Sequence, residues 1–323
     1  MKTLILGSYV NANCLKVSQL PQTGESLLAN DFWSEHGGKG LNVGVALHRL
    51  MGKVELLLPI GQDQSGDAVI SLLEKETLNT RHVVRTSEQS GFGVGFVANN
   101  GDNFLAVYPG ANAHLDEAHV NKALELIDEL SILYAQLEIP QITVVAAFKK
   151  ARTRKITTVL NPSPIQNLHP DLINLSDILI INENEAMHLF GCTHTESRLN
   201  LSDWLRNLPK WANTLQWQNS LLIVTLAERG CVALKQSSIH HQSAWPIIEQ
   251  DATGAGDAFN AGVLYGLNHK LPIADLLSFA CACGSLVASE SGVLLNLPDL
   301  ATVESFMLTR DRPVITTIDL AAS

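Results

Sequence analysis

Short apolar runs alternate with helical patterns through the middle of the chain, and this alternation limits the folds available to it. The runs at residues 131–137, 156–160, 177–181 and 221–226 have the length and composition of buried strands, and helical patterns separate them. Strands that alternate with helices pair as a mostly parallel sheet with helices on both faces. The sequence therefore predicts an α/β fold, with residues 3–10 as the first strand.

Polar side chains recur where these strands end. Asn11, Glu138, Asn161, Asn182 and Glu185 each stand at or just beyond the end of an apolar run. In open α/β sheets, ligands bind beyond the carboxyl ends of the strands. The pattern therefore predicts that these residues border one cleft.

Residues 251–262 place three small residues between two acids, ahead of an apolar helical run. If a helix begins at Ala255 or Gly256, its first N–H groups lack partners and form an anion site. Asp257, in the first turn, can then take a proton from a hydroxyl aimed at that anion. A phosphate site beside a base for an alcohol is what phosphoryl transfer requires. The alternative is an Asp-Gly loop that caps an ordinary helix.

Residues 37–42 (Gly-Gly-Lys-Gly-Leu-Asn) open a second helix, which we expect to run to Leu50. Its glycines permit backbone contact with a ligand. Lys39 and Asn42 lie near the helix start, within reach of the hydroxyls of a polar substrate. For a lone lysine, a solvated surface position is the alternative.

The two stretches resemble a known pair of motifs. Residues 251–262 resemble the C-terminal motif of the PfkB carbohydrate kinases, also called the ribokinase family, and residues 37–42 resemble its N-terminal sugar-binding motif. The likeness is strongest to the ribokinase members and covers nearly the whole chain. It implies a ribokinase-like α/β fold in a single domain, residues 1–323, with a small β-sheet lid formed by about residues 11–36 and 90–108.

The resemblance also implies an activity. It indicates a carbohydrate kinase that uses ATP, Mg²⁺ and a monovalent cation (K⁺), and that phosphorylates a primary hydroxyl of a sugar, with D-ribose the favoured acceptor. Another sugar or a nucleoside is the alternative acceptor. A non-catalytic protein that senses sugars or nucleotides is the alternative from a different class, and the presence of both Asp257 and the anion loop favours the enzyme.

Site residues follow from the same likeness, position by position. Catalysis is assigned to Asp257 together with Gly254, Ala255 and Gly256. Sugar binding is assigned to Asn11, Asn13, Gly38, Lys39, Asn42, Glu138 and Asp257. Nucleotide binding is assigned to Asn182, Thr225, Ala227, Gly230, Gly254, Ala255, Gly256 and Cys281. Metal handling is assigned to Glu185 for Mg²⁺ and to Asp251, Thr253, Ala288, Gly292 and Asn296 for the monovalent cation.

The chain departs from the family pattern at Asn13, at Ala227 and along residues 289–296. Asn13 stands where the ribokinases carry an acid, and an amide lacks the charge-assisted hydrogen bonding of a carboxylate. This departure keeps another sugar, or a nucleoside, open as the acceptor. Ala227 stands where they carry glycine, and its methyl group narrows the space for the nucleotide.

The expected lid predicts a partner. Residues 91–97 (Gly-Phe-Gly-Val-Gly-Phe-Val) alternate with period two, as a half-exposed strand does. A small sheet of this kind leaves one apolar face uncovered unless another surface packs on it. This argument and the family likeness predict a homodimer joined through the lids.

Composition excludes several other classes. The net charge of −10 argues against a general nucleic-acid binder, and no apolar run is long enough to span a membrane. The first strand is not followed by the Gly-x-Gly-x-x-Gly pattern of a nicotinamide dehydrogenase. The five cysteines lack the spacing of a secreted disulfide framework, so we expect packing roles and a cytoplasmic location.

Four further expectations concern structure. Asp67 is expected to cap the helix that follows it, and the tryptophans within residues 194–220 are expected to pack between helices. His240 and His241 are expected in a polar loop. The tail beyond about residue 312 shows no pattern and is expected to be loosely held.

Overall fold

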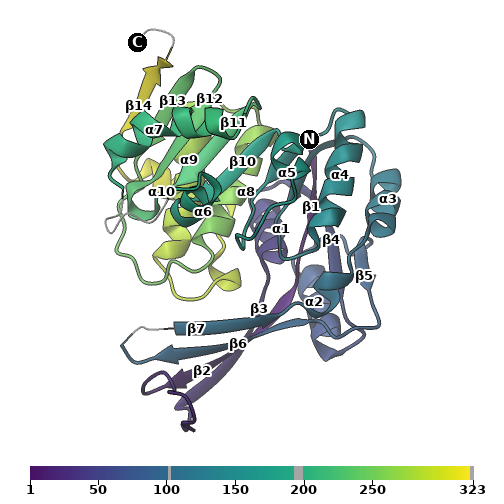
Figure 1. Cartoon of the computed structure of the whole chain (residues 1–323). Helices are drawn as coiled ribbons and strands as arrows, with labels where there is room; N and C mark the ends of the chain where they lie inside the picture. The colour runs from purple at the N-terminus through teal and green to yellow at the C-terminus, as the bar shows by residue number, and fades with distance from the viewer. Residues whose placement is uncertain (101–102, 193–198, 321–323) are drawn as a thin grey trace.

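The computed structural model describes residues 1–100, 103–192 and 199–320, and it contains two β-sheets (Figure 1). Residues 101–102 of the expected lid and residues 194–198 of the tryptophan-bearing segment lie outside the described residues. The larger sheet has ten strands in the order β14-β13-β12-β11-β10-β9-β8-β1-β4-β5. This sheet and the helices that cover it are here called the body. The smaller sheet, here called the lid sheet, has the order β3-β2-β6-β7.

The body sheet is parallel from β5 to β11 and antiparallel from β11 to β14. Its strands are β1 (Lys2–Leu6), β4 (Lys53–Ile60), β5 (Val83–Arg85), β8 (Leu130–Ala135), β9 (Thr157–Leu160), β10 (Ile178–Asn182), β11 (Leu221–Thr225), β12 (Cys231–Lys235), β13 (Ser238–Gln242) and β14 (Ile315–Asp319). The parallel strands are buried almost throughout because helices cover both faces of the sheet.

The helices form two layers, and each layer encloses a separate apolar core against the sheet. One core involves α1 (Lys39–Arg49), α2 (Gln64–Lys75), α8 (Ala255–Asn268), α9 (Ile273–Ala288) and α10 (Leu300–Leu308). The other involves α3 (Glu117–Leu126), α4 (Gln141–Thr153), α5 (Asp171–Leu175), α6 (Glu183–Leu189) and α7 (Leu201–Thr214). Strand β1 serves both cores, because Ile5 faces the first while Leu4 and Leu6 face the second.

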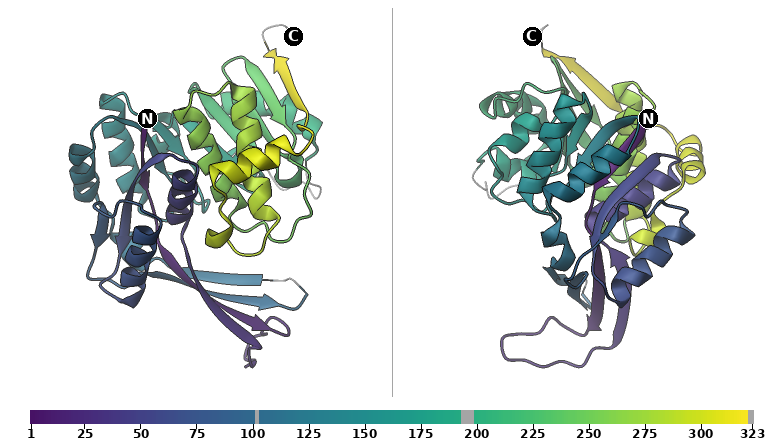
Figure 2. Two further views of the ribbon diagram at one scale, coloured as in Figure 1. Left: turned by 180° about the vertical axis from the view of Figure 1, so that it is seen from behind. Right: turned by 90° about the vertical axis from the view of Figure 1, so that its right-hand side faces the viewer.

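The lid sheet projects from the body below the ends of α8 and α9 (Figures 1 and 2). Its strands are β2 (Val10–Val17), β3 (Asp31–Gly37), β6 (Gly91–Ala98) and β7 (Asn103–Tyr108). The short 3-10 helix η1 (Gly110–His114) follows β7, and two others, η2 (Ala227–Arg229) and η3 (Leu294–Asn296), lie in the body. The predicted α/β class with a small second sheet is confirmed.

Two predictions at the edge of the body sheet are wrong. The tail is not patternless, because Ile315–Asp319 forms β14 and pairs with β13. His240 and His241 lie in β13 and are buried, so they are not in a polar loop. In both cases hydrogen bonding between neighbouring strands overrides a sequence that is polar and weakly periodic.

The helix-capping prediction at α2 is also wrong. Asp63 is the N-cap, and its Oδ1 accepts a hydrogen bond from the Gly66 N–H at 2.8 Å. Asp67 instead lies in the first turn and pairs with Arg85 at 2.6 Å. The prediction that tryptophans pack between helices is confirmed for α7: Trp204 is buried, and the Trp211 ring stacks on Phe190 at the end of α6. In the described part of the chain, no helix is long and apolar enough to cross a membrane.

Candidate functional site

Helix α8 begins at Ala255, so its first turn carries the small residues of the 251–262 stretch. Gly254, the N-cap, has φ +80°, and a Cβ there would lie 2.4 Å from Val293 Cγ1. The Ala255 N–H already donates to Ala252 O at 3.2 Å. Among the described residues the N–H groups of Gly256 and Asp257 have no backbone acceptor, so they are the donors that this helix offers to an anion.

Asp257 is buried in the first turn of α8, with 7% of its surface exposed. Its Oδ2 accepts a hydrogen bond from Asn42 Nδ2 at 2.8 Å, which joins the two sequence motifs directly. Burial raises the pKa of the Asp257 carboxyl to about 6; the Lys39 charge and the Asn42 bond oppose this rise, and Glu138 adds to it. A carboxylate with a pKa near 6 is ionised at neutral pH and basic enough to accept a proton.

The start of α1 is fixed by a close approach to the end of β1. Gly38 has φ +105°, and a Cβ there would lie 2.6 Å from Ser8 O. The Ser8 hydroxyl donates to Glu138 Oε2 at 2.5 Å, and the Lys39 N–H donates to the same oxygen at 3.0 Å. The sequence singled out Glu138 but missed Ser8, which holds it in place.

The Lys39 side chain lies among three carboxylates. Burial lowers its pKa, but Asp257, Glu138 and Glu185 together outweigh burial, so the net shift is upward and the ammonium stays charged. Asn42 Oδ1 is buried and has no hydrogen-bond partner in the described structure. An ammonium, an amide oxygen without a partner among the described residues and the Asp257 carboxylate therefore lie together at the amino ends of α1 and α8.

A cavity of about 850 Å³ adjoins the start of α8. Several residues that line it were predicted from the sequence to bind the nucleotide or a metal ion: Asn182, Thr225, Ala227, Gly230, Ala255, Gly256, Cys281 and Ala288. The sequence did not assign Glu183, Trp245 or Phe259, which also line it. Arg229 pairs with Glu183 at 2.7 Å and so fixes one side of the cavity.

Asn182 and Glu185 form a reciprocal cap on α6. The Asn182 side chain accepts from the Glu185 N–H at 2.8 Å, and Glu185 Oε2 accepts from the Asn182 N–H at 2.9 Å. Within the described ranges, no three His, Cys, Asp or Glu side chains are placed to hold a metal ion by themselves. The arrangement fits Mg²⁺ that is bound largely by phosphates and water, with Glu185 beyond its first ligands.

The five residues assigned to a monovalent cation gather at one loop. Asp251 accepts hydrogen bonds from the N–H groups of Thr253 (2.9 Å) and Gly292 (3.4 Å). The Ala288 carbonyl accepts from the Asp251 N–H at 3.3 Å, and Asn296 Nδ2 donates to the Gly292 carbonyl at 3.2 Å. The structure thus brings these residues together, with several of their oxygens already hydrogen-bonded within the loop.

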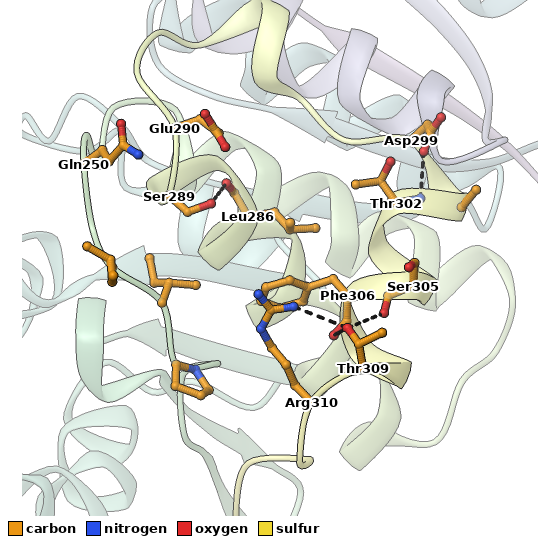
Figure 3. A pocket seen from close by; sticks show the side chains of 14 residues that line it. Gln250, Leu286, Ser289, Glu290, Asp299, Thr302, Ser305, Phe306, Thr309 and Arg310 are labelled. Carbon is orange, nitrogen blue, oxygen red and sulfur yellow. Dashed lines mark hydrogen bonds between the residues drawn. The ribbon is translucent and has the colours of Figure 1, made fainter.

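A second cavity, of about 1010 Å³, lies between α10, the end of α9 and residues 246–250 (Figure 3). The Arg310 guanidinium lies over the Phe306 ring at 4.0 Å from its centre. None of the residues that the sequence assigned to substrate, nucleotide or metal lines this cavity. It adjoins the first cavity at Pro246 and Ile247, which line both.

Asn11 and Asn13 lie on one face of β2 in the lid sheet. Strand β2 pairs Val10, Ala12 and Cys14 with β6 residues Gly91, Gly93 and Gly95. Because side chains alternate along a strand, Asn11 and Asn13 point to the opposite face from Ala12. Ala12 pairs with Glu35 of β3, and it is the Glu35 face that turns toward the Gly292 loop. The two amides therefore face away from that loop.

Sequence reasoning also missed a buried polar chain behind the site. Asn260, one turn after Asp257, donates from Nδ2 to the Tyr134 hydroxyl at 3.0 Å and to Asn161 Oδ1 at 3.2 Å. Asn161 in turn donates to the Ile180 carbonyl at 2.9 Å. Only the position of Asn161 at a strand end signalled this arrangement, which ties α8 to β8, β9 and β10.

The chain is similar to a known protein family over most of its length. Residues 3–300 match the family described as pfkB family carbohydrate kinase. The chain is 29% identical to the ribokinase of Staphylococcus aureus over 308 residues, covering 94% of this chain and 98% of that protein.

Solved structures agree on the fold. The crystal structure of ribokinase from Thermotoga maritima matches with a TM-score of 0.83 at 25% identity, covering 95% of this chain and 99% of that one. Arabidopsis thaliana ribokinase complexed with ribose and ATP matches with a TM-score of 0.85 at 24% identity, covering 95% and 98%. The family match spans both motifs, Asp257 and the lid strands, and the chain therefore belongs to the PfkB family of carbohydrate kinases.

Proposed function

We propose that this protein is an ATP-dependent kinase that transfers the γ-phosphate of ATP to the primary hydroxyl of D-ribose, yielding ribose 5-phosphate. The observation that carries the proposal is the position of Asp257. Its carboxylate accepts a hydrogen bond from Asn42 of the 37–42 motif, while the preceding residue, Gly256, lines the 850 Å³ cavity. The similarity to ribokinases along 94% of the chain supports ribose as the acceptor.

In the proposed mechanism, Asp257 accepts the proton of the primary hydroxyl as that oxygen attacks the γ-phosphorus. The N–H groups of Gly256 and Asp257, at the positive end of the α8 dipole, stabilise charge on the transferring phosphoryl group. The Lys39 ammonium lies on the acceptor side and balances the carboxylates around it. Gly38, Asn42 and Glu138 orient the sugar.

Thr225, Ala227, Gly230 and Cys281 would contact the nucleotide, with Asn182 at the phosphate end. Glu185 would orient waters around Mg²⁺, and the ion would supply positive charge at the phosphates of ATP. We further propose that K⁺ binds at the loop of Asp251, Thr253, Ala288, Gly292 and Asn296. Omission of K⁺ from an otherwise complete assay tests that part of the proposal.

The activity is tested by incubating the protein with ATP, Mg²⁺ and D-ribose and following the products by ³¹P NMR. The expected result is equimolar ADP and a phosphate ester on the C5 oxygen. Ester formation at another carbon, or ATP hydrolysis without an ester, would contradict the proposal. A thermal-shift panel of pentoses, hexoses and nucleosides with an ATP analogue then ranks the acceptors, because bound ligand raises apparent stability.

We also propose a homodimer joined through the lid sheets. The face that carries Asn11 and Asn13 also carries exposed apolar side chains, including Phe104 (60% exposed), Phe32 (58%) and Tyr108 (50%). A face this apolar is costly to leave in water. Sedimentation velocity should show a dimer for the wild type and a monomer for Phe104→Asp. Ile142→Asp, at a comparably exposed site on α4, should remain dimeric.

A further inference from the structure

Two cysteines that are far apart in the sequence meet beside the 850 Å³ cavity. Cys231 is the first residue of β12 and directly follows Gly230, which lines the cavity. Cys281 lies in α9 and lines the cavity itself. The two Sγ atoms are 3.7 Å apart, so one thiol donates a hydrogen bond to the other. All five cysteines of the chain are free, and the pair is therefore reduced.

Cys281 lies on the side of α9 that faces the cavity. Three residues that follow it at helical spacing also line the cavity: Gly284, Ser285 and Ala288. Cys283 lies off this side, because its Sγ is 3.2 Å from the point where a Cβ of Gly262 in α8 would stand. Cys283 therefore packs between α8 and α9, whereas Cys281 borders the cavity and contacts Cys231.

Strand pairing directs the Cys231 side chain to the same place. Cys231 pairs with Thr225 of β11, and residues directly opposite each other in an antiparallel pair share a face of the sheet. Thr225 also lines the cavity. Cys231 has none of its surface exposed and Cys281 only 5%. An oxidant therefore reaches the pair from the cavity, and it meets Cys281 first.

The surroundings of Cys281 keep the pair reduced under ordinary conditions. The hydrogen bond with Cys231 and burial raise the pKa of the Cys281 thiol well above its usual range. The thiolate is the form that reacts with oxidants, so a protonated thiol reacts slowly. The pair should therefore oxidise more slowly than an exposed cysteine does, and only when an oxidant enters the cavity.

We propose that Cys231 and Cys281 are an oxidative modification site, where a peroxide converts the two thiols into a disulfide that weakens nucleotide binding. This inference rests on the proposed function, in which the cavity holds the nucleotide. Cys281, as thiolate, attacks one oxygen of hydrogen peroxide: an S–O bond forms, the O–O bond breaks, and the displaced hydroxide takes a proton and leaves as water. The Cys231 thiolate then attacks the Cys281 sulfur, so that the S–S bond forms and the second oxygen leaves as water. The two sulfurs together lose two electrons, which the peroxide gains.

Disulfide formation changes the wall of the cavity. An S–S bond is about 2.05 Å long, so the two sulfurs must approach each other by roughly 1.6 Å. The Gly230 side has little freedom to move, because a Cβ at Gly230 would lie only 1.9 Å from the Gln242 carbonyl oxygen of β13. Most of the movement therefore draws the Cys281 sulfur away from the nucleotide. Loss of a sulfur–ring contact corresponds to about twofold to tenfold in affinity.

The test treats the reduced protein with hydrogen peroxide, with and without an ATP analogue, and maps disulfides by peptide mass spectrometry. The expected product joins Cys231 to Cys281, and the analogue should slow its formation because it occupies the cavity. The KM for ATP should rise about twofold to tenfold and return to its starting value with dithiothreitol. A disulfide between Cys281 and Cys283, or no disulfide at peroxide concentrations that oxidise the more exposed Cys14 and Cys192, would overturn the inference.

Variants separate this pair from the other thiols. Cys231→Ala should keep the KM for ATP of the untreated protein within about twofold, and Cys231→Ser provides a second variant of similar size. After peroxide, neither should form the disulfide, and Cys281 should oxidise to sulfinic acid, which dithiothreitol does not reverse. Cys192→Ala, the matched control, should respond as wild type does.

A rise in KM that dithiothreitol reverses in Cys231→Ala, or that is missing in Cys192→Ala, would also overturn the inference. Disulfide mapping does not depend on kinase activity. A wild-type protein that forms the disulfide but phosphorylates no sugar would therefore refute the proposed function and leave the modification site standing.

Discussion

Different structural features determine where the candidate functional side chains lie in the body and in the lid sheet. In the body, a polar residue at the carboxyl end of a parallel strand lies at the same edge of the sheet as its neighbours do, and so Glu138, Asn161 and Asn182 border one region. In the lid, the face on which a residue lies depends on strand register, and a shift of one residue moves every side chain to the opposite face. Motifs at strand ends therefore predict which side chains of the body lie near one another, whereas in the lid sheet the strand register is also needed.

The largest expected effect is in the body, at Asp257. Asp257→Asn removes the proposed base while keeping an oxygen for the Asn42 bond, so kcat should fall by about a hundredfold or more. Asp128→Asn, on the body surface, is the matched control and should retain full turnover. Near-normal turnover in Asp257→Asn would show that the motif does not carry the chemistry.

The Asp257→Asn substitution is expected to lower activity without lowering the free energy of unfolding. Because the folded-state pKa of Asp257 is raised, the folded protein holds this proton more tightly than the unfolded chain, and stability decreases as pH rises from about 4 to about 6. The destabilisation caused by ionising the buried Asp257 carboxyl persists at neutral pH. Asp257→Asn removes it, so its free energy of unfolding at pH 7, from urea titration, should be no lower than that of wild type.

The next effect is at the anion site. A Cβ at Gly256 would meet no atom within 4 Å, so the fold accepts a side chain there, but that side chain would enter the nucleotide cavity. Gly256→Val should therefore fold normally and lose ATP binding in calorimetry, with Gly256→Ala intermediate. Unchanged ATP affinity in the valine variant would exclude this helix start from nucleotide binding.

The pH dependence of catalysis should follow the same carboxyl. With a pKa of about 6 for Asp257, kcat/KM should fall about tenfold per pH unit at pH values well below 6 and level off above it. Initial rates between pH 4.5 and 8, with stability checked by circular dichroism at each pH, measure this. A profile that is flat through pH 5 would contradict the role of Asp257 as base.

The smallest effect concerns Ala227, whose φ of +51° is costly for a residue with a Cβ. Ala227→Gly should raise the free energy of unfolding by about 0.5–1 kcal/mol and tighten nucleotide binding by making room in the cavity. Lys155→Gly, at an exposed residue with φ +57° away from the cavity, should give a similar gain in stability with no change in nucleotide affinity. Equal affinities in the two variants would show that the alanine methyl does not narrow the site.

Much of the body could be predicted because its signals are local. The helix start at Ala255 follows from small residues before an apolar run, and the strand ends follow from the alternating pattern. Local signals also misled: Asp63 and Asp67 both suit a helix cap, and only the hydrogen bond to Gly66 distinguishes them. Strand β14 could not be predicted because its order comes from pairing with β13.

The lid sheet shows the limit of sequence reasoning more clearly. Its β2 residues Asn11 to Leu15 are all of intermediate exposure, so burial gives no preference for one face. The Asn11-Ala12-Asn13 pattern predicts sugar contacts, but it does not tell which side chains of the neighbouring strands share a face with the two amides. The pairing of Ala12 with Glu35 and with Gly93 shows which side chains share a face of the lid sheet.

The central claim is that a base and two free helix N–H groups meet at one point, where an alcohol approaches a terminal phosphate. A crystal structure with D-ribose and a non-hydrolysable ATP analogue tests it most directly, through the distance from the ribose O5 atom to the Asp257 carboxylate. The account predicts roughly 2.6–3.2 Å, with the γ-phosphate at the Gly256 and Asp257 N–H groups. A primary hydroxyl bound at Glu138 and out of hydrogen-bonding reach of Asp257 would contradict it.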